Sequence, residues 1–241
     1  MAITKSIIKI KKNKYPESTV KIVKIFTDNE ISLMRDLYEE LPLTINNIEQ
    51  KTLKKQWIQN YKKELDIVYH NRIMEVLNDF QMDNLKDKHG DDIYGLFQES
   101  FKPLPLHADT GFNLDNKTYK QLLTPLSGFG ETIIFKNRWY SESTTFTVDE
   151  EELEFIPGTN KNKRSNKHII KGKKFDPIIH KKFLNHIDIN NLEGIEIDTI
   201  YKWKIGETLI FDRTHLHSSS SNLNNKKLGL VTFTKNNLIA V

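Results

Sequence analysis

The chain of 241 residues carries 36 lysine and arginine residues against 32 aspartate and glutamate residues, a net charge of +4. It has no cysteine, which excludes disulfides, zinc fingers, thiolate nucleophiles and cysteine-bound iron–sulfur clusters. The charges nearly balance and few basic residues are arginine, so we expect no specific nucleic-acid binding. No apolar run reaches the roughly 18 residues of a membrane span, and residues 1–14 lack the apolar region of a signal peptide. We therefore expect a soluble, cytoplasmic protein.

The N-terminal part, residues 1–91, is expected to form a mixed, partly helical flank. A short apolar run over residues 20–25 resembles a strand. Thr27–Glu30 has the Thr-x-x-Glu pattern of a capping box, which predicts a helix that ends at Pro42. Apolar residues at helical spacing predict a second amphipathic helix over about residues 62–80.

Strand-like segments dominate residues 92–140 and 200–235. They are rich in β-branched and aromatic residues and are bounded by Gly, Asn or Pro. The segments are Ile93–Glu99, Leu104–Asp109, Thr118–Leu126, Glu131–Lys136, Ile200–Lys204, Thr208–Asp212 and Leu228–Thr234. Many short strands predict a mainly β domain with flanking helices, a sandwich or jelly roll that spans residues 1–241 as a single domain.

Residues 141–199 interrupt this pattern and are expected to form an insertion between core strands. The insertion contains an acidic run at 149–152 and a basic stretch at 161–174. It is either a solvated surface loop with a short helix near Pro177–His186 or a lid over an active site, since long loops in compact domains are often functional.

A His-x-Asp pattern suggests a metal site. Residues i and i+2 of a strand point to one face, so such a pair can offer a nitrogen and an oxygen ligand to one metal. A distant histidine, here His215 or His217, would complete a facial triad of two histidines and one carboxylate. The pattern occurs three times, as His89–Asp91, His107–Asp109 and His186–Asp188. The first lies in a polar turn and the third in the insertion, whereas His107 and Asp109 end a predicted strand.

Four motifs in order carry a resemblance to a known family. They are Leu106–Gly111, Tyr119–Leu126, Gly206–Ser219 and Lys227–Leu230. This set resembles the iron(II)/2-oxoglutarate-dependent oxygenase superfamily, and within it the phytanoyl-CoA-hydroxylase-like microbial and phage members. The resemblance implies a double-stranded β-helix (jelly roll) and a dioxygenase that uses Fe(II), 2-oxoglutarate and O2, and that hydroxylates a C–H bond of a small molecule.

The resemblance also implies roles for particular residues. His107, Asp109 and His217 would hold the iron, with His215 beside the site rather than in it. Lys227, ten residues after His217, stands where the family usually has an arginine, and it would bind the 5-carboxylate of 2-oxoglutarate. Lysine supplies the charge but not the bidentate geometry of arginine. The other reading of Lys227 is a solvent-facing start of a strand, in which case its neighbour Lys226 is the alternative cation.

Three further polar residues are candidates for the site, and two of them have two readings. Ser219 matches a serine of the family and would assist Lys227. Gln121 either reaches the inner carboxylate of the cofactor or bonds within the barrel. Arg138, with Trp139 and Tyr140, ends a strand at the expected barrel mouth and either packs at an edge or binds substrate.

Two other classes of function remain open from the sequence. One is a catalytically silent jelly-roll binding module without iron. The other is a cupin-type metal enzyme, a hydrolase or isomerase, that uses the same ligands but not 2-oxoglutarate. The sequence does not indicate the substrate or the oligomeric state.

Overall fold

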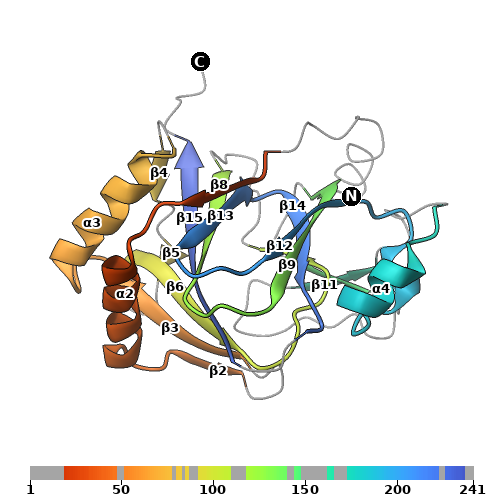
Figure 1. Ribbon diagram of the computed structural model, residues 1–241, viewed down its shortest axis with the longest axis horizontal. Coiled ribbons are helices and arrows are strands. Elements are labelled where there is room, and N and C mark those ends of the chain that lie inside the picture. The colour runs from red at the N-terminus through yellow and green to blue at the C-terminus, as the bar shows by residue number, and fades with distance from the viewer. Residues whose placement is uncertain are drawn as a thin grey trace.

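The fold is seen in a computed structural model that describes residues 19–47, 52–77, 80–82, 85–86, 92–109, 118–139, 144–147, 162–165, 173–222 and 226–236. Its strands form two sheets, with helices α2 and α3 at one end of the view and α4 at the other (Figure 1). None of the helices in these stretches is long and apolar enough to cross a membrane.

The larger sheet is antiparallel. In spatial order its strands are β1 (Lys21–Lys24), β13 (Glu207–Asp212), β8 (Thr118–Pro125), β15 (Lys227–Asn236), β6 (Asp92–Ser100), β3 (Thr52–Ile58) and β2 (Ile45–Asn47), with β4 (Phe80–Met82) beside β15 and β5 (Leu85–Lys86) beside β6.

The smaller sheet is antiparallel except at one edge, where its first two strands run parallel. Its order is β11 (Asn162–Ser165), β10 (Thr144–Thr147), β7 (His107–Ala108), β14 (His215–Ser219), β9 (Glu131–Arg138) and β12 (Ile197–Lys202). Strand β10 lies in the segment expected to be an insertion, and here it pairs with β7.

The two sheets pack against each other through one buried cluster. Leu209 and Phe211 of the larger sheet contact Ile134 and Tyr201 of the smaller sheet in this cluster, and all four side chains are buried. Burial of this apolar surface is the main force that holds the sheets together.

Helices α2 (Asp28–Glu40) and α3 (Lys63–Met74) cover the outer face of the larger sheet. The predicted capping box is present, because the Oγ1 atom of Thr27 accepts a hydrogen bond from the Glu30 amide at 3.2 Å. Helix α3 is shorter than predicted. Phe80 belongs to β4 instead, where it pairs with Asn236 of β15.

A separate layer covers the outer face of the smaller sheet. It contains α4 (Pro177–Phe183), which is the predicted short helix, and the 3-10 helix η1 (Ile189–Leu192). Leu184 and Leu192 of this layer pack against Phe135 and Leu216 of the sheet. Residues 148–161 and 166–172, on which the lid hypothesis rests, lie outside the described residues. The prediction of a mainly β domain with flanking helices is confirmed.

Candidate metal centre and active site

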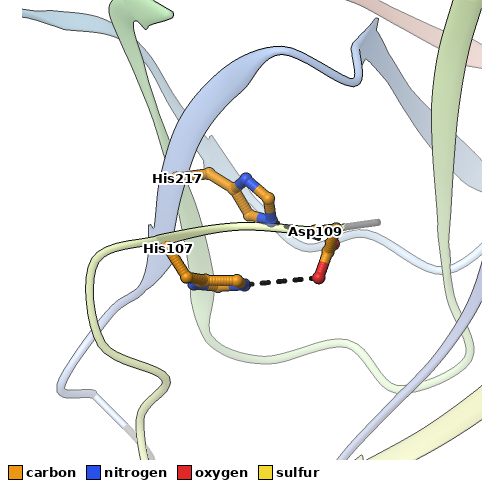
Figure 2. Close-up of side chains that lie close together, drawn as sticks. All are labelled: His107, Asp109 and His217. Carbon is orange, nitrogen blue, oxygen red and sulfur yellow. Dashed lines mark hydrogen bonds and ion pairs between the residues drawn. The ribbon is translucent and has the colours of Figure 1, made fainter. Parts of the chain in front are cut away.

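The two strands β7 and β14 bring the candidate metal ligands together. His107 of β7 and His217 of β14 are directly opposed Cα partners in the antiparallel ladder. Opposed residues project to the same face of a sheet. Asp109 directly follows β7, and its carboxylate lies to one side of the two rings and faces a nitrogen of each (Figure 2).

The ligand atoms of these three side chains lie within 4.8 Å of one another. The Nε2 atom of His217 is 3.2 Å from Oδ2 of Asp109, and Nε2 of His107 is 3.7 Å from Oδ1. Both histidines are buried, whereas the side chain of Asp109 is 18% exposed. Two imidazoles and one carboxylate at this spacing form the donor set of a facial triad.

Backbone carbonyls determine which nitrogen of each ring carries the proton. The Nδ1 atom of His107 lies 2.7 Å from the carbonyl oxygen of Pro105, and Nδ1 of His217 lies 3.2 Å from that of His215. A carbonyl oxygen only accepts, so each Nδ1 carries hydrogen and donates. With Nδ1 carrying the hydrogen, the Nε2 atoms of both rings face the Asp109 carboxylate, and the three groups together offer two nitrogen ligands and one oxygen ligand. The three residues therefore fit a divalent metal ion, and the carbonyls set the ligand orientation.

Gln121 of β8 supports the carboxylate. Its Nε2 atom donates to Oδ2 of Asp109 at 2.6 Å. The side chain is buried, and its Oε1 atom has no hydrogen-bond partner. Gln121 thus fixes one carboxylate oxygen and presents a second polar atom within the same site.

Lys227, the first residue of β15, lies at the inner end of the site. It is 3% exposed, and its Nζ atom donates to the carbonyl oxygen of Glu131 at 2.8 Å. The same atom lies 4.1 Å from the centroid of the Trp203 ring. Burial lowers the pKa of the Lys227 amine to about 7, an effect that the carboxylate of Glu131 partly offsets.

Ser219 of β14 faces the same space. Its Oγ atom accepts a hydrogen bond from the Leu104 amide at 2.5 Å, which leaves the hydroxyl hydrogen to donate elsewhere. The structure brings all six sequence candidates to the wall of one cavity: His107, Asp109, Gln121, His217, Ser219 and Lys227.

The cavity has further lining residues that the sequence analysis missed. Trp203 belongs to the buried cluster between the sheets and also forms a wall of the cavity, where its Nε1 atom donates to Oγ1 of Thr132 at 2.8 Å. Gln98 and Ser100 of β6 line it as well. No local sequence signal marks these residues, because their role depends on which strands become neighbours.

His215 lies beside the triad and makes a different contact. Its Nδ1 atom donates to the carbonyl oxygen of Phe135 at 2.6 Å. Burial and the neighbouring guanidinium of Arg138 lower the pKa of His215 to about 4, so this ring is neutral. The carboxylate of Asp212 pairs with Lys120 and Arg138.

Comparisons with known proteins bear on the fold. No protein-family model and no curated protein matches the sequence. A structure of HygX from Streptomyces hygroscopicus with nickel and 2-oxoglutarate matches with a TM-score of 0.51 and 10% identity, covering 98% of this chain and 88% of that one. The epimerase SnoN, in complex with Fe3+, alpha ketoglutarate and nogalamycin RO, matches with a TM-score of 0.50 and 8% identity, covering 98% and 84%.

A second HygX structure, which also holds hygromycin B, matches with a TM-score of 0.50 and 10% identity, covering 98% of this chain and 88% of that one. At such low identity the likeness concerns the fold, and it extends over nearly the whole described chain. The chain has the jelly-roll, double-stranded β-helix fold that these 2-oxoglutarate-binding proteins share.

Proposed function

We propose that this protein is a non-haem Fe(II)/2-oxoglutarate-dependent dioxygenase that hydroxylates a C–H bond of a small molecule, with O2 as co-substrate. The observation that carries the proposal is the convergence of two Nε2 lone pairs and a carboxylate from His107, His217 and Asp109. This donor set leaves coordination positions open, as the chemistry requires.

His107, Asp109 and His217 would hold the iron. When bound together, iron and 2-oxoglutarate supply oxidative decarboxylation to succinate and the activation of O2. The protein holds the two rings in one tautomer through the carbonyls of Pro105 and His215. It also surrounds the ligands with buried side chains, which keeps bulk water away from the metal.

Lys227 would bind the 5-carboxylate of 2-oxoglutarate, with Ser219 as a hydroxyl donor. Both residues line the cavity that the metal ligands also line. The buried amine needs an anion, and the available hydroxyl hydrogen of Ser219 is suited to a carboxylate. Gln121 would bind the inner part of the cofactor through its unpaired Oε1 or, after an amide flip, its amide group.

Finer assignments belong to the same proposal. Membership of the phytanoyl-CoA-hydroxylase-like microbial and phage group rests on the sequence motifs alone. A small-molecule substrate is inferred from the scarcity of arginine and from the cavity that the triad lines, and a cytoplasmic location is inferred from the composition. HygX with hygromycin B and SnoN with nogalamycin RO are jelly-roll proteins that bind small molecules.

Anaerobic titration tests the proposal. Fe(II) should bind with a stoichiometry of one, and 2-oxoglutarate should then give a weak visible charge-transfer band. Exposure to air should convert 2-oxoglutarate to succinate, measured by NMR. A chain that binds no metal would be a silent binding module. Metal-dependent activity without 2-oxoglutarate consumption would identify a cupin-type enzyme instead.

A further inference from the structure

A second polar cluster lies next to the metal site, around Arg138 at the end of β9. The arginine is 2% exposed. Its Nη1 atom donates to Oδ2 of Asp212 at 3.0 Å and to Oγ1 of Thr214 at 3.2 Å. Its Nε and Nη2 atoms are fully buried and have no hydrogen-bond partner.

The two unpaired atoms form one edge of the guanidinium group. The N–H bonds of Nε and Nη2 run parallel, and this edge matches the two oxygens of a carboxylate in a bidentate pair. Buried donors without acceptors cost free energy, and those of a charged group cost more. An ion pair with Asp212 alone needs only Nη1, so it does not account for the empty edge.

Strand register places this edge relative to the metal ligands. On β9, the Cα partner of His215 is Arg138, whereas Ser219 pairs with Thr132. His217 lies between His215 and Ser219 on β14. Arg138 is therefore on the opposite side of His217 from Ser219, which is the side away from the proposed cofactor carboxylate.

The ion pair between Arg138 of the smaller sheet and Asp212 of the larger sheet places this cluster between the two sheets. The Phe211 ring lies 5.3 Å from the His217 ring and 6.2 Å from the His215 ring, centroid to centroid. His215 and His217 thus share one wall with Phe211, which lines the cavity. Arg138 is the Cα partner of His215 in the ladder and so lies next to this wall, although it is not itself among the residues that line the cavity.

We propose that Arg138 determines substrate specificity by binding a carboxylate of the substrate through its Nε and Nη2 atoms. This inference rests on the proposed function and adds the substrate class, a small carboxylic acid. A carboxylate satisfies two parallel donors with both of its oxygens, whereas a phosphate would pair two oxygens there and leave others that need further donors. The contact of Nη1 with Asp212 and Thr214 holds the free edge in a fixed orientation.

Side-chain NMR tests the proposal without a known substrate. The chain has five arginines, so the 15Nε–1Hε spectrum is small enough to assign with single variants. The full chain is loaded with Zn(II), which is diamagnetic, and with one equivalent of 2-oxoglutarate, and is then titrated with acetate. We expect a saturable shift of the Arg138 resonance and none at Arg35, whose Nε and Nη2 atoms are already occupied by the Leu126 carbonyl at 2.9 and 2.6 Å.

The other outcomes contradict the proposal. If the Arg138 resonance does not shift when acetate is added, Arg138 does not bind a carboxylate. A response to inorganic phosphate but not acetate would reject the carboxylate class. A shift produced by 2-oxoglutarate itself would assign Arg138 to the cofactor. A protein that binds neither Zn(II) nor 2-oxoglutarate would refute the proposed function, a different result from a loaded protein whose Arg138 ignores acetate.

Variants provide a second measurement. Arg138→Lys keeps the charge but loses the two-donor edge, so the acetate affinity should fall at least tenfold while Zn(II) and 2-oxoglutarate binding persist. Arg35→Lys is the matched control and should keep the acetate response of Arg138. Equal acetate affinity in Arg138→Lys and the parent protein would overturn the bidentate contact. If Arg138→Lys does not fold, the titration of the parent protein still decides.

Discussion

The Nζ atom of Lys227 lies 4.1 Å from the ring centroid of Trp203 and donates to the carbonyl oxygen of Glu131 at 2.8 Å. The ring face and the carbonyl both attract a cation. Neither carries a full negative charge, however, and burial still lowers the pKa of the amine to about 7. A bound carboxylate would therefore stabilise the protonated form of this amine.

Replacement of Lys227 by an uncharged residue should affect thermal stability and 2-oxoglutarate affinity differently. Lys227→Met keeps most of the side-chain volume and removes the buried charge, so the thermal stability of the metal-free protein at pH 6.5 should stay equal or rise. Breaking a buried ion pair typically costs about 3–5 kcal/mol, so the affinity for 2-oxoglutarate should fall by about two orders of magnitude or more. Calorimetric titration and thermal unfolding measure the two effects.

Lys226→Met is the matched control for this variant. The Lys226 side chain is 70% exposed and pairs with Glu99 rather than facing the cavity. Its loss should leave 2-oxoglutarate affinity within a factor of about two. If Lys226→Met loses the affinity and Lys227→Met keeps it, the roles of the two lysines are reversed.

The same amine predicts a pH dependence. In the unfolded chain Lys227 has its ordinary pKa of 10.5, whereas the folded value is about 7. Between these values the unfolded chain binds more protons, so this group makes the metal-free protein more stable as pH rises from 7 towards 10. A bound carboxylate raises the pKa of Lys227 again, so 2-oxoglutarate binding at pH 8 should take up a proton and weaken as pH increases.

Calorimetric titration of 2-oxoglutarate in buffers of different ionisation enthalpy measures how many protons are taken up on binding. We expect uptake of a substantial fraction of one proton at pH 8 in the parent protein and none in Lys227→Met. Proton uptake that persists in Lys227→Met would assign the titration to another group.

Identical substitutions two residues apart test the metal ligands. His217→Asn removes a ligand whose Nε2 atom faces Asp109, so stoichiometric Fe(II) binding should be lost. His215→Asn should retain it, because that ring bonds the Phe135 carbonyl and an asparagine amide can also donate. Anaerobic metal titration with circular dichroism as a folding control distinguishes the two. If His217→Asn keeps Fe(II) binding and His215→Asn loses it, His215 and not His217 is the metal ligand.

Gln121 should act on the metal through Asp109. Gln121→Met removes the 2.6 Å hydrogen bond to Oδ2 and frees the carboxylate to rotate. Loss of such an outer contact typically lowers metal affinity by about 10–100-fold. Gln98→Met changes another glutamine of the same cavity, one that bonds Ser100, and should leave metal affinity unchanged. Equal effects of the two variants would indicate general disturbance of the cavity.

The strands rich in β-branched and aromatic residues were predictable from the sequence, and strands without that composition were missed. Strand β13 (Glu207–Asp212) combines β-branched and aromatic residues, and it lies within two residues of the predicted segment. Strand β3 (Thr52–Ile58) contains two lysines and a glutamine, and strand β14 (His215–Ser219) consists mostly of histidine and serine. Their strand conformation comes from pairing with neighbours on both sides, which overrides weak local propensity.

The site shows the same division. Spacing and alternation indicated His107, Asp109 and a distant histidine, because these depend on local geometry. The hydrogen bonds that fix the ring tautomers run to carbonyls only two residues away, but they depend on local backbone geometry that the residue types do not specify. The empty edge of Arg138 depends on contacts between strands that lie far apart in the chain. Asp212 and Arg138 are 74 positions apart in the sequence, and no local sequence pattern predicts their contact.

Gly130 provides a last test, of how the cavity wall positions Lys227. Its φ is 87°, a left-handed conformation, and a Cβ atom there would lie 3.2 Å from Cδ and 3.3 Å from Cε of Lys227. Gly206 has a similar φ of 82°, but a Cβ atom there would meet Lys24 and the backbone of Phe26 at 3.4 Å. Gly130→Ala and Gly206→Ala should therefore both lose roughly 1–2 kcal/mol of folding stability from backbone strain.

Only Gly130→Ala should also weaken 2-oxoglutarate binding, by about tenfold, a change of about 1.4 kcal/mol. The added methyl group pushes on the Lys227 side chain, whereas Gly206 lies near β1 and away from the cavity lining. Denaturant unfolding of each variant measures the shared strain, and calorimetric titration measures the difference in cofactor affinity. Cofactor affinities that fall equally in the two variants would show that backbone strain alone disturbs the site, and would remove Gly130 as a specific support of Lys227.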